Sequence, residues 1–154
     1  MGIVADVGVV GRTAVGAVLL VSGVAKVPSR SWPAQARAFG LPRPLVLALP
    51  WAEIGLGAVT VAQLGGWPVD SAALVLLMAF TAAVARRVAA GNAPPCACFG
   101  DVSSRPASWR TVGRNGVVCA LAALGLSAGS PHPAALAIGV GVAALVVVAE
   151  LSVA

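Results

Sequence analysis

The chain has 154 residues, of which 59% are hydrophobic and 10% charged, and its mean hydropathy is +0.96. A soluble domain carries about 25% charged residues, so this composition excludes a water-facing globular protein and indicates a membrane protein with the lipid bilayer as its surroundings. The formal net charge of +5 does not point to nucleic acid, because the basic residues gather in two gaps between apolar stretches and the chain has no Tyr and three Phe for base stacking.

Five apolar stretches approach or reach the length of about 20 residues that a spanning helix needs. They predict helices over residues 7–27, 45–64, 69–90, 112–128 and 134–154. The expected fold is all-α: a polytopic transmembrane helical bundle of four core helices plus a fifth. We expect the whole chain to form a single domain, multi-pass in the cell membrane. No basic residue precedes the first apolar run, so cleavage of a signal peptide is not expected.

The breaks between these stretches are of two kinds. The segments "QLGGWP" and "GSPHP" are short turns, so the second and third stretches, and the fourth and fifth, are expected to form hairpins. Residues 28–43 include a short amphipathic piece with Trp32 and Phe39, expected to lie in the membrane interface. Residues 91–111 form a longer gap that holds a cysteine motif.

The motif is "PPCACFG", with Cys96 and Cys98 separated by one residue. This spacing is too short for the C-x-x-C pair of a zinc site, which would also need two further ligands. Cys119 and His132 are the remaining Cys and His, and they lie on separate segments. We therefore expect no metal.

A C-x-C pair can instead close into a small, strained disulfide that exchanges easily. The two preceding prolines and the following glycine restrict the backbone there. The nearby residues Arg105, Arg110 and Arg114 favour a thiolate. From these residues alone, an exchangeable pair and two inert or structural thiols carry similar weight. Cys119 lies one turn beyond Asn115, where packing is favoured over a third, resolving thiol.

Glu53 is an acidic residue near the start of the second stretch, where a carboxylate is costly unless paired. Its expected partner is Lys26, Arg12 or Arg114, and a side chain that reaches the interface is the alternative. Asp70 sits at a helix end and is given no special role.

Four segments in chain order carry a resemblance to a known family: "SGVAKV", "LPWAEIGLG", "CACFG" and "RN". Over about residues 8–128 the chain resembles the methylamine utilisation protein MauE family, a branch of the DoxX-like membrane proteins. The resemblance implies a redox pair at Cys96 and Cys98 and supporting residues at Arg114 and Asn115. It also implies an intramembrane polar pair, Lys26 with Glu53.

The resemblance further implies a protein that assists thiol–disulfide chemistry with a thioredoxin-like partner, as proposed for methylamine dehydrogenase maturation. Such a chain is either a thiol–disulfide oxidoreductase or an accessory to one. The alternative is a non-catalytic membrane anchor or assembly factor for that partner, and a small transporter is less favoured. No cofactor is evident; a quinone is left open as a cofactor, although no residue pattern supports one. The Gly and Ala faces would permit a homo-oligomer.

The two long gaps lie on one side of the membrane if there are five spans. Their arginines favour the cytoplasmic side. Disulfide chemistry on exported clients, which the resemblance implies, favours the opposite side. The residues leave these two orientations open.

Overall fold

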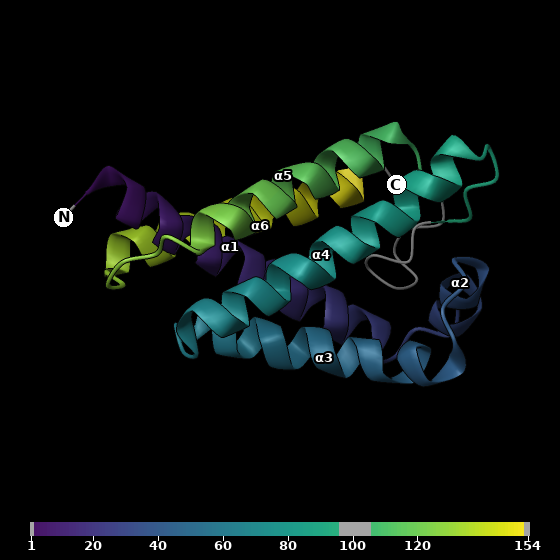
Figure 1. Ribbon diagram of the computed structural model, residues 1–154, viewed down its shortest axis with the longest axis horizontal. Coiled ribbons are helices and arrows are strands. Elements are labelled where there is room, and N and C mark those ends of the chain that lie inside the picture. Colours follow the sequence, from purple (N-terminus) through teal and green to yellow (C-terminus); the bar gives the residue numbers. More distant parts are fainter. Residues whose placement is uncertain (1, 96–105, 153–154) are drawn as a thin grey trace.

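The computed structural model describes residues 2–95 and 106–152, with side chains described up to residue 149. In these ranges the chain is a bundle of helices (Figure 1). They are α1 (Ile3–Lys26), α2 (Trp32–Ala38), α3 (Arg43–Val61), α4 (Gly66–Ala89), α5 (Trp109–Gly125) and α6 (Pro133–Ser152). The predicted all-α bundle is confirmed. Each long helix begins one to four residues before its predicted range.

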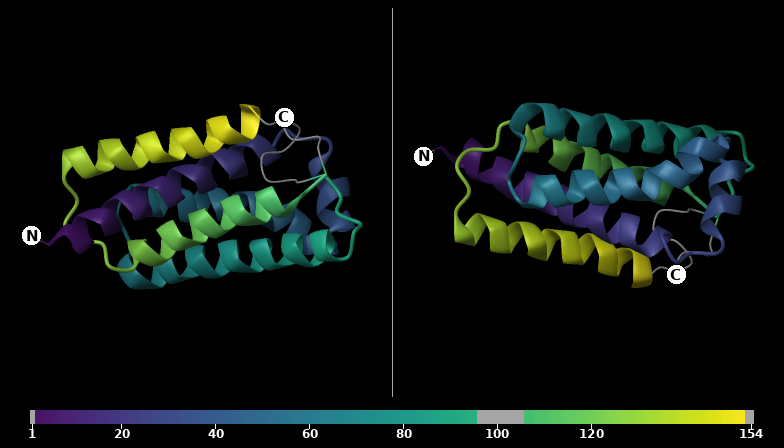
Figure 2. Two further views of the ribbon diagram at one scale, coloured as in Figure 1. Left: turned by 90° about the horizontal axis from the view of Figure 1, so that it is seen from above. Right: turned by 90° about the horizontal axis from the view of Figure 1, so that it is seen from below.

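α1 is the central helix of the bundle, because it packs against α3, α5 and α6. Of its 24 residues, 13 are buried, whereas α4 of equal length buries 3. Figure 2 shows α6 on one side of α1 and α5 on the other. α1 therefore forms the core, and the outer faces of the other helices are left for lipid.

The expected hairpin of the fourth and fifth stretches is wrong in its packing. A turn joins α5 to α6, but α1 lies between the two helices (Figure 2). Glycines allow this arrangement. A Cβ atom on Gly139 of α6 would lie 2.9 Å from the carbonyl oxygen of Val10, and one on Gly11 of α1 would lie 2.5 Å from that of Leu121 in α5. Because both neighbours approach the α1 backbone so closely, they pack on it more tightly than on each other.

The outer surface is apolar. Side chains such as Leu47, Val75 and Leu145 are more than 60% exposed. Three of the described helices, α1, α3 and α4, are long and apolar enough to cross a membrane, and residues Pro133–Ala149 form a shorter apolar helix. Trp67 and Trp109 stand exposed at the first turns of α4 and α5, where indoles favour the membrane–water interface. These features are those of a membrane protein.

The contact between α1 and α3 depends on a pair of glycines. A Cβ atom on Gly57 would lie 2.7 Å from the backbone nitrogen of Leu20 and 2.8 Å from the carbonyl oxygen of Gly16. Neither of these atoms can move without moving α1. Gly55, two residues earlier on α3, faces open space.

Gly57→Ala is expected to lower stability by about 1–3 kcal/mol, because the added methyl group forces α1 and α3 apart. Gly55→Ala is the matched control and should leave stability unchanged or raise it, since Ala is the better helix former. Thermal unfolding of both variants in detergent measures the difference. Equal melting temperatures for the two variants would contradict close packing at Gly57.

Candidate functional site at the loop end of the bundle

A buried ion pair joins the last residue of α1 to the middle of α3. The Lys26 ammonium lies 2.5 and 2.6 Å from the two carboxylate oxygens of Glu53, and it donates to Ser22 Oγ at 2.8 Å. The Lys26 and Glu53 side chains are 1% and 8% exposed. Of the three partners predicted for Glu53, the structure selects Lys26. At the C-terminus of α1 the helix dipole also favours a cation.

Gly23 brings the two helices close enough for this pair. A Cβ atom there would lie 2.7 Å from the carbonyl oxygen of Pro50, one turn before Glu53 on α3. With no side chain at Gly23, the backbones meet and the long side chain of Lys26 reaches the carboxylate. The "SGVAK" and "PWAE" segments are thus two halves of one contact.

Aromatic rings from two further helices enclose the ammonium. Lys26 Nζ lies 4.9 Å from the ring centre of Trp32 in α2 and 5.8 Å from that of Phe80 in α4. Both distances allow attraction between the cation and the ring face. α1, α2, α3 and α4 therefore all contribute to the surroundings of one charge.

Trp32 is held in place by a defect in α3. Pro50 lies inside α3 and has no N–H, so the carbonyl of Val46, one turn earlier, lacks its helical donor. The Trp32 indole N–H donates to this carbonyl at 2.9 Å. The predicted short helix after α1 is present as α2, but Trp32 is 4% exposed and packs into the protein.

A second polar group lies on α5. Arg114 donates to the side-chain carbonyl oxygen of Asn115 at 2.9 Å. Asn115 is 9% exposed, and its amide nitrogen has no hydrogen-bond partner among the described residues. Because Arg114 takes the amide oxygen, it is the nitrogen, a donor, that is left over.

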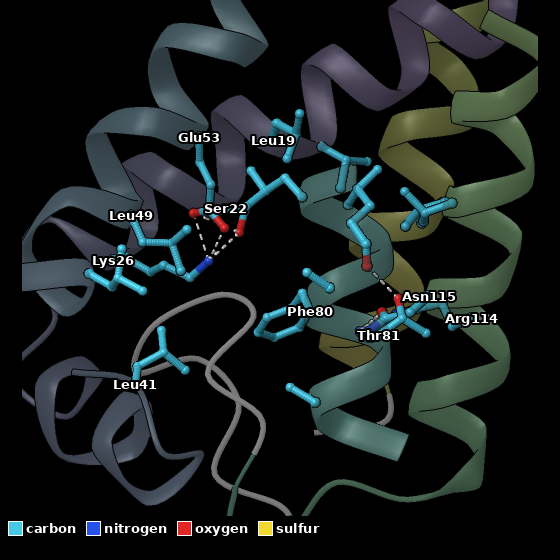
Figure 3. Close-up of a pocket in the computed structure, with 18 residues that line it drawn as sticks. Leu19, Ser22, Lys26, Leu41, Leu49, Glu53, Phe80, Thr81, Arg114 and Asn115 are labelled. Atoms are coloured by element: carbon cyan, nitrogen blue, oxygen red, sulfur yellow. Dashed lines mark hydrogen bonds and ion pairs between the residues drawn. The ribbon is translucent and has the colours of Figure 1, made fainter. Parts of the chain in front are cut away.

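A cavity of about 290 Å³ lies between these two polar groups. Figure 3 shows Lys26 and Glu53 on one side, Arg114 and Asn115 on the other, and Phe80 between them. Half of the described lining residues are Leu or Val, and they come from α1, α3, α4, α5, α6 and the segment between α2 and α3. Four of the six site residues predicted from the sequence therefore line one cavity. Among the described residues, no three His, Cys, Asp or Glu gather as metal ligands would.

The other two predicted site residues, Cys96 and Cys98, lie outside the described residues. The ends of their loop are described. Ala107 N–H donates to the carbonyl of Pro94 at 3.1 Å, and Pro95 forms an isolated antiparallel bridge with Pro106. Ala107 is buried in the same core cluster as residues of α1, α4 and α5. The described residues on the two sides of this gap, Pro95 and Pro106, therefore lie next to each other at the edge of the bundle.

Comparison with known proteins matches residues 4–128 to the family model described as methylamine utilisation protein MauE. The chain belongs to the MauE family. The predicted resemblance is thus confirmed, and the match runs from α1 through the end of α5. It includes every predicted site residue and leaves α6 outside.

A MauE relative is also similar in sequence. The chain is 37% identical over 111 residues to the methylamine utilization protein MauE of Methylorubrum extorquens. The aligned part is 68% of this chain and 59% of that protein, so the chain spans less than two thirds of the relative's length. No solved structure matches the chain.

This MauE-family chain contains a second buried ion pair that the sequence reasoning missed. Arg12 Nε lies 2.8 Å from Asp70 of α4, and Arg12 also donates to the carbonyl of Leu64 at 2.7 Å. The expectation that Asp70 needs no special account is wrong, because it is 6% exposed and compensates an arginine in the middle of the core helix. The signal was present: a basic residue inside an apolar span calls for an acidic partner.

Cys119 lies between α4 and α5. Its sulfur is 3.5 Å from Thr81 Oγ1, and Thr81 in turn donates to the carbonyl of Leu77 at 2.7 Å. The thiol is half-buried and free. This position agrees with a packing role for Cys119.

The Lys26–Glu53 pair can be tested by a double-mutant cycle. Lys26→Met and Glu53→Gln should each cost about 3–5 kcal/mol of unfolding free energy, because each leaves one charge buried without its partner. The double variant should lose much less than the sum. Denaturation in mixed micelles, followed by circular dichroism, gives the three values.

Arg37→Met is the control for this cycle. Arg37 is exposed, and its guanidinium donates to the carbonyl of Pro33 on the same short helix. Its removal should change stability by no more than about 0.5 kcal/mol. Additive losses at Lys26 and Glu53 would show that the two side chains act independently.

Proposed function

We propose that this membrane protein assists thiol–disulfide chemistry through Cys96 and Cys98. The observation that carries the proposal is the meeting of two features at one end of the bundle. The ends of the cysteine loop join there, and four residues predicted as its polar companions line a cavity there. Membership of the MauE family supports the same role.

The proposed reaction is an exchange with a thioredoxin-like partner. A thiolate of the partner attacks one sulfur of the Cys96–Cys98 disulfide and forms a mixed disulfide. The second partner thiolate then attacks the mixed bond, and the pair leaves as a dithiol. The partner gains the disulfide that this chain loses, so atoms and electrons balance. A C-x-C disulfide favours this direction because its ring is strained.

The polar residues have distinct proposed roles. Arg114 lies near the first turns of α5, where its positive charge would stabilise a thiolate delivered to that end of the bundle. Asn115 fixes the Arg114 guanidinium through the hydrogen bond between them. The Lys26–Glu53 pair would accept and return protons as thiols form and close. None of these roles requires a metal.

We further propose a multi-pass arrangement in the cell membrane. α2 and the α4–α5 loop ends lie at the same end of the bundle, since Phe39, Arg87 and Asn92 line one groove. The relative is named for methylamine utilization, and maturation of a disulfide-containing methylamine-oxidising enzyme is the corresponding client process. A thioredoxin-like protein is the proposed partner.

Replacement of the cysteines tests this function. Cys96→Ser and Cys98→Ser should each abolish client disulfide formation, and one of them should accumulate a mixed disulfide with the partner, visible as a reducible band. Cys119→Ser is the matched control and should retain full activity. Acid trapping followed by alkylation, with a membrane-impermeant reagent in intact cells, reports both the redox state and the side of the loop.

The competing hypothesis predicts a different result. If the chain is a non-catalytic anchor, both loop variants support normal client disulfide formation and still bind the partner. That outcome would refute the redox role.

A further inference from the structure

The cavity between α1, α3, α4 and α5 has the character of a ligand site. Small-molecule pockets are mainly apolar, with a few convergent polar groups that orient the ligand. This one holds about 290 Å³ and is walled by side chains such as Leu19, Leu49, Leu77 and Val118. That volume suits a single ring-sized head group. Because the chain is a membrane protein, a ligand for this cavity would come from the lipid phase.

The unsatisfied group in the cavity wall is a hydrogen-bond donor. Lys26 already donates to Glu53 and Ser22, so the ion pair is satisfied without a ligand. The Asn115 amide nitrogen is buried and lacks a partner among the described residues. A buried donor left unpaired costs about 1–3 kcal/mol. The ligand that removes this cost must present an acceptor oxygen.

The charges narrow the class of ligand. The charged groups of the wall already have partners, since Lys26 pairs with Glu53 on the far side of the cavity from Asn115 (Figure 3) and Arg114 donates to Asn115. The group that remains among the described residues is the uncharged amide nitrogen of Asn115, which calls for a neutral acceptor. The hydrocarbon part of a lipid fits the apolar wall but carries no oxygen to accept from Asn115. A flat, neutral ring with carbonyl oxygens at its edge meets both requirements, and Phe80 between the polar groups offers a face for it.

We propose that this cavity binds the head group of a lipid-soluble quinone, with one carbonyl oxygen accepting a hydrogen bond from Asn115. The role of the quinone rests on the proposed thiol chemistry, whereas the position of its binding site rests on the cavity. Closing a dithiol to a disulfide releases two electrons and two protons, and reduction of a quinone to a quinol consumes two of each. The cysteine pair, once reduced by its partner's thiols, is thereby reoxidised without another co-reactant.

Photolabelling tests the site on the full chain in phospholipid nanodiscs. The probe is an azido-substituted short-chain ubiquinone, and the labelled peptides are identified by mass spectrometry. Labels should map to α4 and α5, and unlabelled ubiquinone should compete for them whereas oleic acid should not. Equal competition by oleic acid would show an acyl-chain site and overturn the proposal, as would labelling that no quinone displaces.

Two variant pairs locate the site. Asn115→Leu should weaken quinone binding about tenfold, the value of one hydrogen bond, whereas Gln63→Leu removes an amide outside the cavity and should not. Ala83→Phe fills the cavity from α4 and should abolish labelling. Ala82→Phe places the same ring on the exposed side of α4 and should preserve it. Unchanged labelling of a folded Ala83→Phe variant would refute the cavity as the site.

The quinone site and the thiol function can fail separately. The Cys96→Ser/Cys98→Ser double variant should still be labelled, because neither residue is part of the proposed quinone contact. Labelling that persists while the cysteine variants retain full client activity would refute the redox role and support the cavity assignment. Normal cysteine cycling with no displaceable labelling would overturn the quinone proposal alone.

Discussion

The buried charge of Lys26 is the constraint on which the rest of the structure depends. An ammonium at 1% exposure is tolerated only where a carboxylate and further acceptors replace its hydration. Here Glu53 and Ser22 supply the oxygens, and Trp32 and Phe80 supply the ring faces. Meeting that requirement fixes α2, α3 and α4 relative to the end of α1, and the cavity is the space that they leave beside the charge.

The Arg12–Asp70 pair repeats this requirement in the middle of α1. Arg12 and Lys26 are fourteen residues apart, which is about 21 Å along a helix. One charge pairs with α4 and the other with α3. A helix apolar on every side could slide or rotate among its neighbours, whereas two buried ion pairs at different depths allow α1 a single depth and rotation. The glycines then permit the backbone contact that this placement demands.

Much of the fold could be predicted from the sequence, because membrane-spanning helices require long apolar stretches that are easily recognised. The apolar spans, the short helix with Trp32 and the family all followed from local patterns. What did not follow was the choice of neighbours. A helix that is apolar all round has no polar face to orient it, so the position of α1 between α5 and α6 was not predictable. Asp70 was set aside because it lies near a helix end, whereas its importance depends on Arg12 lying beside it.

Pro50 shows how a helix defect can become a point of attachment. The proline removes one backbone donor from α3, so the carbonyl of Val46 has no helical partner. It accepts a hydrogen bond from the indole N–H of Trp32 instead. This hydrogen bond holds the Trp32 ring with its face toward Lys26. The missing N–H of Pro50 therefore helps to place the Trp32 ring that covers the Lys26 ammonium. In this fold, the absence of a hydrogen on the tertiary amide nitrogen of Pro50 sets the position of an aromatic ring over a buried charge.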